Sequence, residues 1–328
     1  MKILKNVCYS IAALSVFMAP ALAQDKFPSR TIEIVVPSGA GGGQDTLVRM
    51  IQPQLEKDLG VSIRVTNVSG GAHSKGIIYS HNAEADGHLI HCESPSGIIA
   101  DIFKKMPFRF TEEFVPVARM QADIGVLWTG SKGKFNSVQE MIDFAKKNPG
   151  KVTVAIASPG GVDDAGVGYF AKAAGIQLAI VPVESGGERM ASVIANHIDM
   201  MYEEASAVGD MMKSGNLRPL VVFRDDRIQV GELKDTPAAG ELGLKGLGAL
   251  GTWRGFAVKK GTPQPVIDRW VAAFKKIYDT PEYQNYAKEN GLDLNPGWMG
   301  PEEFGKLWKD NEATFREVFV ELGRVKPE

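Results

Sequence analysis

Residues 31–45, TIEIVVPSGAGGGQD, lead from an apolar strand into a helix through a glycine-rich turn. The apolar residues of 31–36 predict a strand, and 37–43 predicts a loop. From 46 to 59, leucine or isoleucine at every fourth position predicts a helix that Gly60 ends. A strand, a glycine-rich turn and a helix in this order are typical of a parallel α/β fold.

The same order of elements recurs along the chain, and the carboxyl-terminal part is helical. This alternation predicts two α/β units with mostly parallel sheets and flanking helices. Ligands of open α/β sheets bind beyond the carboxyl ends of the strands, so two facing units would form a ligand cleft. The predicted strands are 61–65, 89–92, 151–157, 178–183 and 198–202, and the predicted helices are 164–174, 189–196, 265–278, 282–290 and 302–322.

The first 23 residues have the organisation of a secretory signal peptide. Lys2 and Lys5 precede an apolar segment, 7–18, which is shorter than the about 20 residues that a membrane anchor needs. Residues 21–23, Ala-Leu-Ala, form a small-x-small cleavage site. We therefore predict signal-peptide cleavage after Ala23 and export to the periplasm.

Length and charge narrow the class of protein. A chain of 328 residues suggests about two domains of roughly 100–200 residues each. The formal net charge of −2 and the absence of a basic block exclude a typical nucleic-acid-binding protein. Cys92 is the only cysteine that follows the signal peptide, so no internal disulfide is predicted.

The turn at 37–45 is suited to binding an anion. Consecutive glycines let backbone N–H groups converge, and the following helix adds the partial positive charge of its amino terminus. This predicts an anion site without a basic side chain; the alternative is a plain strand–helix turn. Gln44 stands where a dinucleotide fingerprint needs glycine, and no Gly-Lys-Ser/Thr is present. Asp45 either fixes a water or hydroxyl beside a carboxylate or caps the helix.

Two further glycine-rich turns, at 70–74 and 158–161, also stand between a predicted strand and a helix. Three such turns, one of them in the second unit, predict a cleft lined by backbone N–H donors. Within the 70–74 turn, His73 is the histidine that we expect to contact a ligand.

The sequence predicts no catalytic residue, metal ion or cofactor. His88 and His91 are three apart on a predicted strand and face opposite sides, so they cannot share a metal ion. No G-x-S-x-G or H-E-x-x-H motif occurs. The acid pairs at 163–164 and 203–204 are expected to be solvated or to cap helices, because neighbours on a strand face apart.

An ordered set of short motifs runs along the chain after the signal peptide and resembles one family. The motifs are 27–32, 34–37, 41–45, 67–76, 86–87, 114–118, 233–237, Glu241 with Gly243, 253–255, 261–263 and 299–304. Together they resemble the TctC or Bug family, the solute receptors of tripartite tricarboxylate transporters. The resemblance implies a two-lobed Venus-flytrap periplasmic binding protein fold. Lobe one would comprise 24–122 and 254–328, and lobe two 123–253.

The resemblance also implies that the carboxylate of the ligand is held between the lobes by backbone amides and ordered water. Carried over to this sequence, the lobe-one residues are Ser38, Ala40, Gly41, Gly42, Asp45, Gly71, Ala72, His73 and Ser74. The lobe-two residues are Ser158, Gly160, Gly161, Val162, Ser185, Tyr202 and Glu203.

The implied function is a monomeric receptor that captures a small organic carboxylate by hinge closure and delivers it to a membrane permease of the tripartite type. The alternatives are an exported sensor subunit and a secreted lyase or hydrolase. Glu184 and Glu203 would make the lobe-two side of the cleft acidic, or else they face solvent. Facing the ligand, they would repel a second carboxylate and favour a monocarboxylate or a zwitterion.

Overall fold

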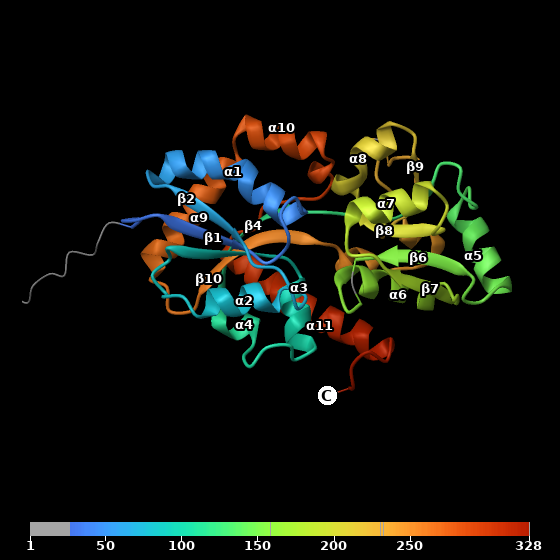
Figure 1. The fold of residues 1–328 in the computed structure, drawn as a ribbon, viewed down its shortest axis with the longest axis horizontal. Helices are drawn as coiled ribbons and strands as arrows, with labels where there is room; N and C mark the ends of the chain where they lie inside the picture. The colour runs from blue at the N-terminus through green and yellow to red at the C-terminus, as the bar shows by residue number, and fades with distance from the viewer. Residues whose placement is uncertain (1–26, 158, 230, 232, 328) are drawn as a thin grey trace, which may run out of the picture.

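The computed structural model describes residues 27–157, 159–229, 231 and 233–327. The predicted signal peptide, its cleavage site after Ala23, and Ser158 lie outside these residues. Figure 1 shows two α/β bodies side by side, each with a sheet flanked by helices, which confirms the predicted two-lobed α/β fold. Within the described residues, no helix is long and apolar enough to cross a bilayer.

Lobe one is built on a five-stranded sheet in the order β2-β1-β3-β10-β4. Strand β10 runs antiparallel to both of its neighbours, and the other four strands share one direction, so the sheet is mostly parallel as predicted. The strands are β1 (Ile32–Val36), β2 (Ile63–Asn67), β3 (Leu89–Glu93), β4 (Phe114–Ala122) and β10 (Trp253–Lys259). The helices are α1 (Gly43–Leu59), α2 (Ser74–His81), α3 (Ser96–Ile102), α4 (Phe110–Glu113), α9 (Gln264–Tyr278), α10 (Pro281–Glu289), the 3-10 helix η3 (Leu292–Leu294) and α11 (Pro301–Glu321).

Lobe two repeats this design in the order β7-β6-β8-β5-β9, with β5 as the strand that opposes the other four. The strands are β5 (Gly125–Gly130), β6 (Val152–Ile156), β7 (Leu178–Pro182), β8 (Met200–Glu204) and β9 (Leu217–Val222). The helices are α5 (Val138–Lys147), α6 (Val162–Ala173), α7 (Gly186–Ile194) and α8 (Ala205–Lys213), with the 3-10 helices η1 (Ala239–Leu242) and η2 (Leu247–Leu250).

The two opposing strands fix which edge of each sheet faces the other lobe. The chain enters lobe two as β5 and returns to lobe one as β10, so both strands begin at the junction between the lobes. Gly125, the first residue of β5, pairs with Glu204 at the end of β8, and Gly255 of β10 pairs with Glu93 at the end of β3. The carboxyl ends of the parallel strands of both lobes therefore meet at the junction.

The stripe predicted for the first helix anchors α1 on its sheet. Leu47, Ile51 and Leu55 have no exposed surface and pack in one cluster with Trp270 and Phe274 of α9. The helix begins at Gly43, three residues earlier than predicted, so its first turn contains a glycine of the anion-site turn.

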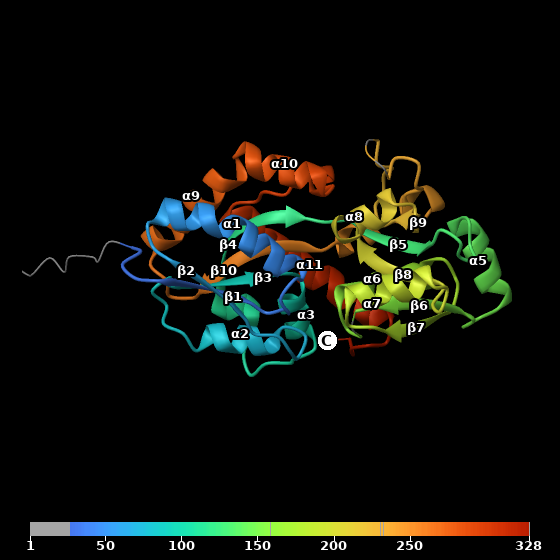
Figure 2. The same ribbon diagram turned by 45° about the horizontal axis from the view of Figure 1, so that its top comes forward.

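The last long helix, α11, packs on both lobes. Phe304 and Trp308 lie in a lobe-one cluster with Trp253, whereas Phe315 and Phe319 are buried in the lobe-two core. In Figure 2, α11 passes from beneath the lobe-one sheet toward α6. The lobe boundaries 24–122, 254–328 and 123–253 stay predictions, and the second half of α11 adds a further contact between the lobes.

Replacing Phe319 with alanine tests how much the contact between α11 and lobe two stabilises the protein. Phe319 is fully buried and packs edge-to-face on Phe103, with ring centroids 4.9 Å apart. We expect Phe319→Ala to lower the free energy of unfolding by about 3–5 kcal/mol in chemical denaturation. Glu317→Ala, on the exposed side of the same helix, is the control and should change it by about 0.5 kcal/mol or less. Equal losses in the two variants would contradict the packing described.

Candidate ligand-binding site

The turn before α1 presents backbone N–H groups at the junction. Gly41 has a φ of +79°, which places it in the left-handed region that favours glycine. The first helical hydrogen bond runs from the N–H of Thr46 to the carbonyl of Gly42. Within the described residues, the N–H groups of Gly43 and Gln44 have no acceptor. These groups and the helix dipole are the features that an anion site requires.

Asp45 holds this turn in place. Its Oδ2 accepts from the N–H of Gly41 at 2.8 Å and from Arg49 at 2.9 Å, and its Oδ1 accepts from Asn67 at 3.0 Å. Only 2% of the residue is exposed. Burial alone would raise its pKa, but the donors from Arg49, Gly41 and Asn67 outweigh burial and lower it. Of the two predicted roles, the geometry matches bracing of the turn, because both oxygens are engaged by the protein.

The turn before α6 repeats the arrangement in lobe two. Gly160 has a φ of +73°, and its N–H donates to Asp164 Oδ2 at 2.8 Å, again four residues along the chain. The N–H of Ala157 donates to Asp163, and α6 begins after Gly161 without a side-chain cap. Asp163 and Asp164 were expected to be solvated or to cap, but both are buried and brace the turn. The predicted contacts Gly160, Gly161 and Val162 lie in this turn.

The 70–74 loop stands beside the first turn. Asn67 at the end of β2 donates to the carbonyl of Ser38 at 3.1 Å, which joins the two. Residues 70–73 all have positive φ, although Ala72 and His73 are not glycines. The Ser74 hydroxyl donates to the carbonyl of Gly71 at 2.8 Å and so closes the turn.

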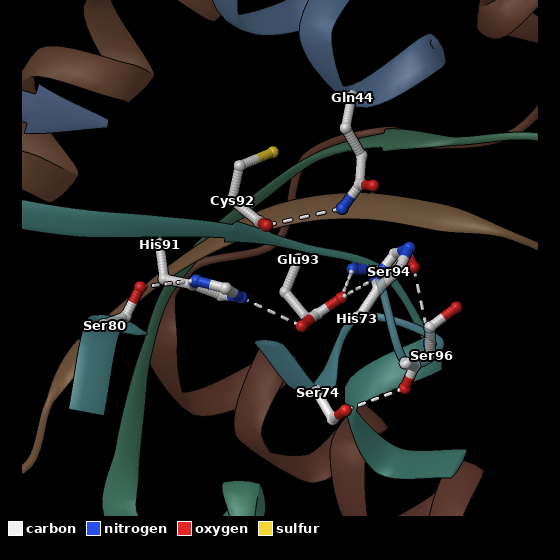
Figure 3. Close-up of polar contacts among 10 residues, drawn as sticks. Gln44, His73, Ser74, Ser80, His91, Cys92, Glu93, Ser94 and Ser96 are labelled. Atoms are coloured by element: carbon white, nitrogen blue, oxygen red, sulfur yellow. Dashed lines mark hydrogen bonds and ion pairs between the residues drawn. The ribbon is translucent and has the colours of Figure 1, made fainter. Parts of the chain in front are cut away.

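His73 is anchored to a buried carboxylate that the sequence analysis missed. Its Nδ1 lies 2.8 Å from Glu93 Oε1, and Glu93 Oε2 lies 2.9 Å from His91 Nε2 (Figure 3). Glu93 has no exposed surface. Burial would raise its pKa, but the charges and hydrogen bonds of the two histidines outweigh burial and lower it to about 2. In the sequence, the available signal of this buried acid was its position directly after the predicted strand 89–92.

His88 precedes β3 and His91 lies within it, and the two side chains have different partners. His88 accepts from the N–H of Ser29 at 3.1 Å, and His91 lies 2.9 Å from Ser80 Oγ. Among the described residues, no group of three His, Cys, Asp or Glu side chains could hold a metal ion.

Glu203 is paired with Arg189, a residue that the sequence analysis also missed. Arg189 Nε lies 3.2 Å from Glu203 Oε2, and its Nη1 donates to the carbonyls of Val183 and Glu184. The carboxyl groups of Glu203 and Glu204 also hydrogen-bond to each other, so the expectation that they face apart was wrong. The strand ends at Glu204, where alternation of side chains no longer holds the two apart. Burial and then Glu204 raise the pKa of Glu203 to about 8, although Arg189 opposes this.

Two other residues of the predicted lobe-two site, Tyr202 and Ser185, and the nearby Glu184 differ in their surroundings. Tyr202 is 3% exposed in the lobe-two core, and its hydroxyl has no partner within the described residues. The Ser185 hydroxyl accepts from the N–H of Glu188 at 3.4 Å and so caps α7. Glu184 is exposed to solvent.

Arg254 places a positive charge directly behind the glycine-rich turn that precedes α1. A Cβ built on Gly43 would lie 2.4 Å from Arg254 Nη2, so the guanidinium packs against the first turn of α1. Arg254 Nη1 lies 3.1 Å from Gln121 Oε1 and 3.2 Å from Asp123 Oδ2, and all three side chains are buried. The turn thus gains a basic group that the sequence analysis did not expect.

Two glycine-rich turns with buried acids behind them lie at the facing strand ends of two α/β lobes, and solved periplasmic binding proteins share this two-lobed fold. The family described as the tripartite tricarboxylate transporter family receptor (TctC) matches residues 47–323. The chain belongs to this family, which confirms the resemblance seen in the sequence motifs.

Individual relatives resemble this chain in sequence, and solved structures resemble it in fold. A UPF0065 protein of Pseudomonas sp. strain P51 is 29% identical over 300 residues, which cover 90% of this chain and 88% of the relative. MatC from Rhodopseudomonas palustris, solved with bound malate, is 24% identical with a TM-score of 0.78, covering 89% of this chain and 99% of MatC. An R. palustris protein solved with adipate is 22% identical with a TM-score of 0.80, and the match covers 90% of this chain and 98% of that protein. The two structures share the fold of this chain.

The raised pKa of Glu203 predicts a specific pH dependence of stability. A carboxyl whose pKa rises from 4.5 to about 8 on folding stabilises the protein most below pH 4.5, and this contribution is lost as the pH rises through about 8. In Glu203→Gln, which cannot ionise, we expect the free energy of unfolding to fall less over this range than in the wild type. Glu184→Gln, at an exposed position, should follow the wild type. Parallel curves for all three proteins would show that Glu203 does not titrate in this way.

Proposed function

We propose that this protein is a periplasmic receptor that binds a small organic carboxylate between its lobes and delivers it to a tripartite tricarboxylate permease. The observation that carries the proposal is the pair of braced turns. Gly41 with Asp45 and Gly160 with Asp164 place the amino termini of α1 and α6 at the carboxyl ends of β1 and β6. An anion between them would be attracted by oriented N–H groups and helix dipoles.

The charges at the junction admit a ligand with two carboxylates. Burial and the neighbouring Glu204 raise the pKa of Glu203, so the pair resists carrying two negative charges. Arg189 pairs with Glu203, and Arg254 pairs with Asp123, whose pKa is raised by burial. The repulsion expected from Glu203 is therefore offset, and Glu184 is exposed. Malate and adipate, bound by the two structural relatives, are both dicarboxylates and support this ligand class.

Binding by closure of the lobes agrees with the connections between them. The chain crosses between the lobes through Asp123-Ile124, just before β5, and through Gly251-Thr252, just before β10, and short crossovers can act as hinges. A ligand that contacts turns of both lobes binds the closed form more tightly and shifts the equilibrium toward it. The permease would then recognise the closed receptor, which acts as a monomer. The ligand-binding residues predicted from the sequence belong to this proposal, as does signal-peptide cleavage after Ala23.

A pair of glycine variants tests whether the first turn is the site. A carboxylate screen by thermal shift identifies the ligand, because a ligand at 100 times its Kd adds about 2.7 kcal/mol of stability. Gly41→Ala places a Cβ in open space but at a φ of +79°, which costs about 1–2 kcal/mol and shifts the N–H groups. We expect the affinity for that ligand, measured by calorimetry, to fall about tenfold or more, because charge-assisted hydrogen bonds are lost.

Gly60→Ala is the matched control. Gly60 has a φ of +73° and equally open space, but it ends α1 at the far end of the helix from the turn. It should lose the same stability and keep its affinity. Equal affinities in both variants would exclude the first turn as the site, and failure of every carboxylate to bind the wild type would overturn the proposed function.

A further inference from the structure

The end of the chain packs along one face of α6, as Figure 2 shows for the last turns of α11. Lys172 Nζ lies 2.9 Å from Glu321 Oε2. A Cβ built on Gly168 would lie 2.7 Å from Cδ1 of Leu322. Because Gly168 and Lys172 are four residues apart, they lie on the same face of the helix. From Glu321 to Leu322, the contacts therefore move toward the amino terminus of α6.

Arg324 continues this contact to the first turn of α6. Gly323 has a φ of +67°, and its N–H donates to the carbonyl of Val320 at 2.9 Å. The N–H of Arg324 donates to the carbonyl of Phe319 at 2.7 Å, which completes the cap that ends α11. The cap turns the chain back toward α6, where Arg324 Nη2 lies 3.2 Å from Oδ1 of Asp164.

Asp164 is the acid that braces the lobe-two turn. Its Oδ2 accepts from the N–H of Gly160 at 2.8 Å, so the turn engages one oxygen and Arg324 the other. Only 1% of Asp164 is exposed, and solvent therefore screens this ion pair less than a pair between two surface groups. A buried carboxylate that loses a donor is destabilised, so the contact with Arg324 helps to fix the turn.

The turns before α1 and α6 correspond position by position. In each, a glycine N–H donates to the aspartate four residues later, and the residue after the aspartate donates to the glycine before the helix. The lobe-one aspartate, Asp45, also accepts from Arg49, which lies four residues further along α1. The corresponding residue of α6 is Gly168, which has no side chain to donate.

Arg324 supplies the arginine that α6 lacks. Leu322 occupies the space that a side chain at Gly168 would need, and the cap that follows brings Arg324 to Asp164. Both bracing aspartates thus have an arginine partner, one on the same helix and one at the end of the chain. Since α11 begins in lobe one, where Phe304 is packed, this contact joins the lobe-two turn to a helix that both lobes share.

We propose that Arg324 is a positioning residue of the lobe-two turn. Through Asp164 it fixes Gly160 and thereby raises the affinity for an anion bound at the junction. The effect on affinity rests on the proposed function, whereas the effect on the turn is measurable without a ligand. The carboxyl-terminal segment then contributes to binding although it lies outside both glycine-rich turns.

Three variants separate this role from a general effect on stability. Arg324→Met removes every donor of the side chain, and Arg324→Lys keeps its charge. Lys172→Gln is the matched control, because it removes a second ion pair between α6 and the same segment, about two helical turns further from the lobe-two turn. Hydrogen exchange of the Gly160 amide in the unliganded protein measures the turn, with the Gly41 amide as the internal reference. Calorimetry with malate, adipate and the carboxylate found by the thermal-shift screen measures affinity.

We expect Arg324→Met to speed exchange at Gly160 by about three- to tenfold, the effect of one hydrogen bond, and to leave exchange at Gly41 unchanged. The affinity for the carboxylate should fall by about the same factor. Arg324→Lys should recover part of both losses, and Lys172→Gln should match the wild type. Once Asp164→Asn is present, Arg324→Met should have no further effect, because Arg324 acts through that carboxylate.

Four results would overturn the proposal. They are wild-type exchange at Gly160 in Arg324→Met, an equal rise at Gly41, an unchanged affinity, and an undiminished effect of Arg324→Met once Asp164→Asn is present. Each of them leaves the proposed function intact. If the wild type binds no carboxylate, the proposed function fails, and exchange at Gly160 still decides whether Arg324 fixes the turn.

Discussion

The direction of two strands determines where this protein can bind a ligand. Strands β5 and β10 begin where the chain crosses between the lobes, and each runs antiparallel to the strand beside it, β8 or β3. The carboxyl ends of the parallel strands must therefore face the junction in both lobes. Every turn that leads from a parallel strand into a helix then presents N–H groups, not carbonyl groups, toward the other lobe.

Buried acids maintain this arrangement without making the junction negative. Asp45 and Asp164 accept hydrogen bonds from the turns they brace, and Glu93 accepts from two histidines and a backbone N–H. Glu203 is paired with Arg189. Each carboxylate is engaged by donors of the protein itself, so its field is largely compensated. What remains for a ligand is a set of N–H donors, among them those of Gly43 and Gln44.

Local sequence patterns predicted the parts of this structure that depend on neighbouring residues. The strand–turn–helix order, the apolar stripe of α1 and the turn at 37–43 need only local spacing and glycine, and the structure contains all three. The pairings across the chain could not be predicted in this way. Arg254 packs on Gly43 although the two are far apart in the sequence. Asp163 and Asp164 are expected from the sequence to be solvated or to cap a helix, because the hydrogen bonds that they accept from the turn exist only once the turn is folded.

A crystal structure of the protein with its carboxylate ligand tests the central claim most directly. The account predicts a carboxylate at the junction, about 2.7–3.2 Å from the N–H groups of Gly43 and Gln44, with the lobe-two turn at Gly160 facing it. The lobe-one sheet also has a cavity of about 400 Å³ at the opposite ends of its strands, lined by Arg30, Arg64 and His88. A ligand bound there, with the junction empty, would contradict the account.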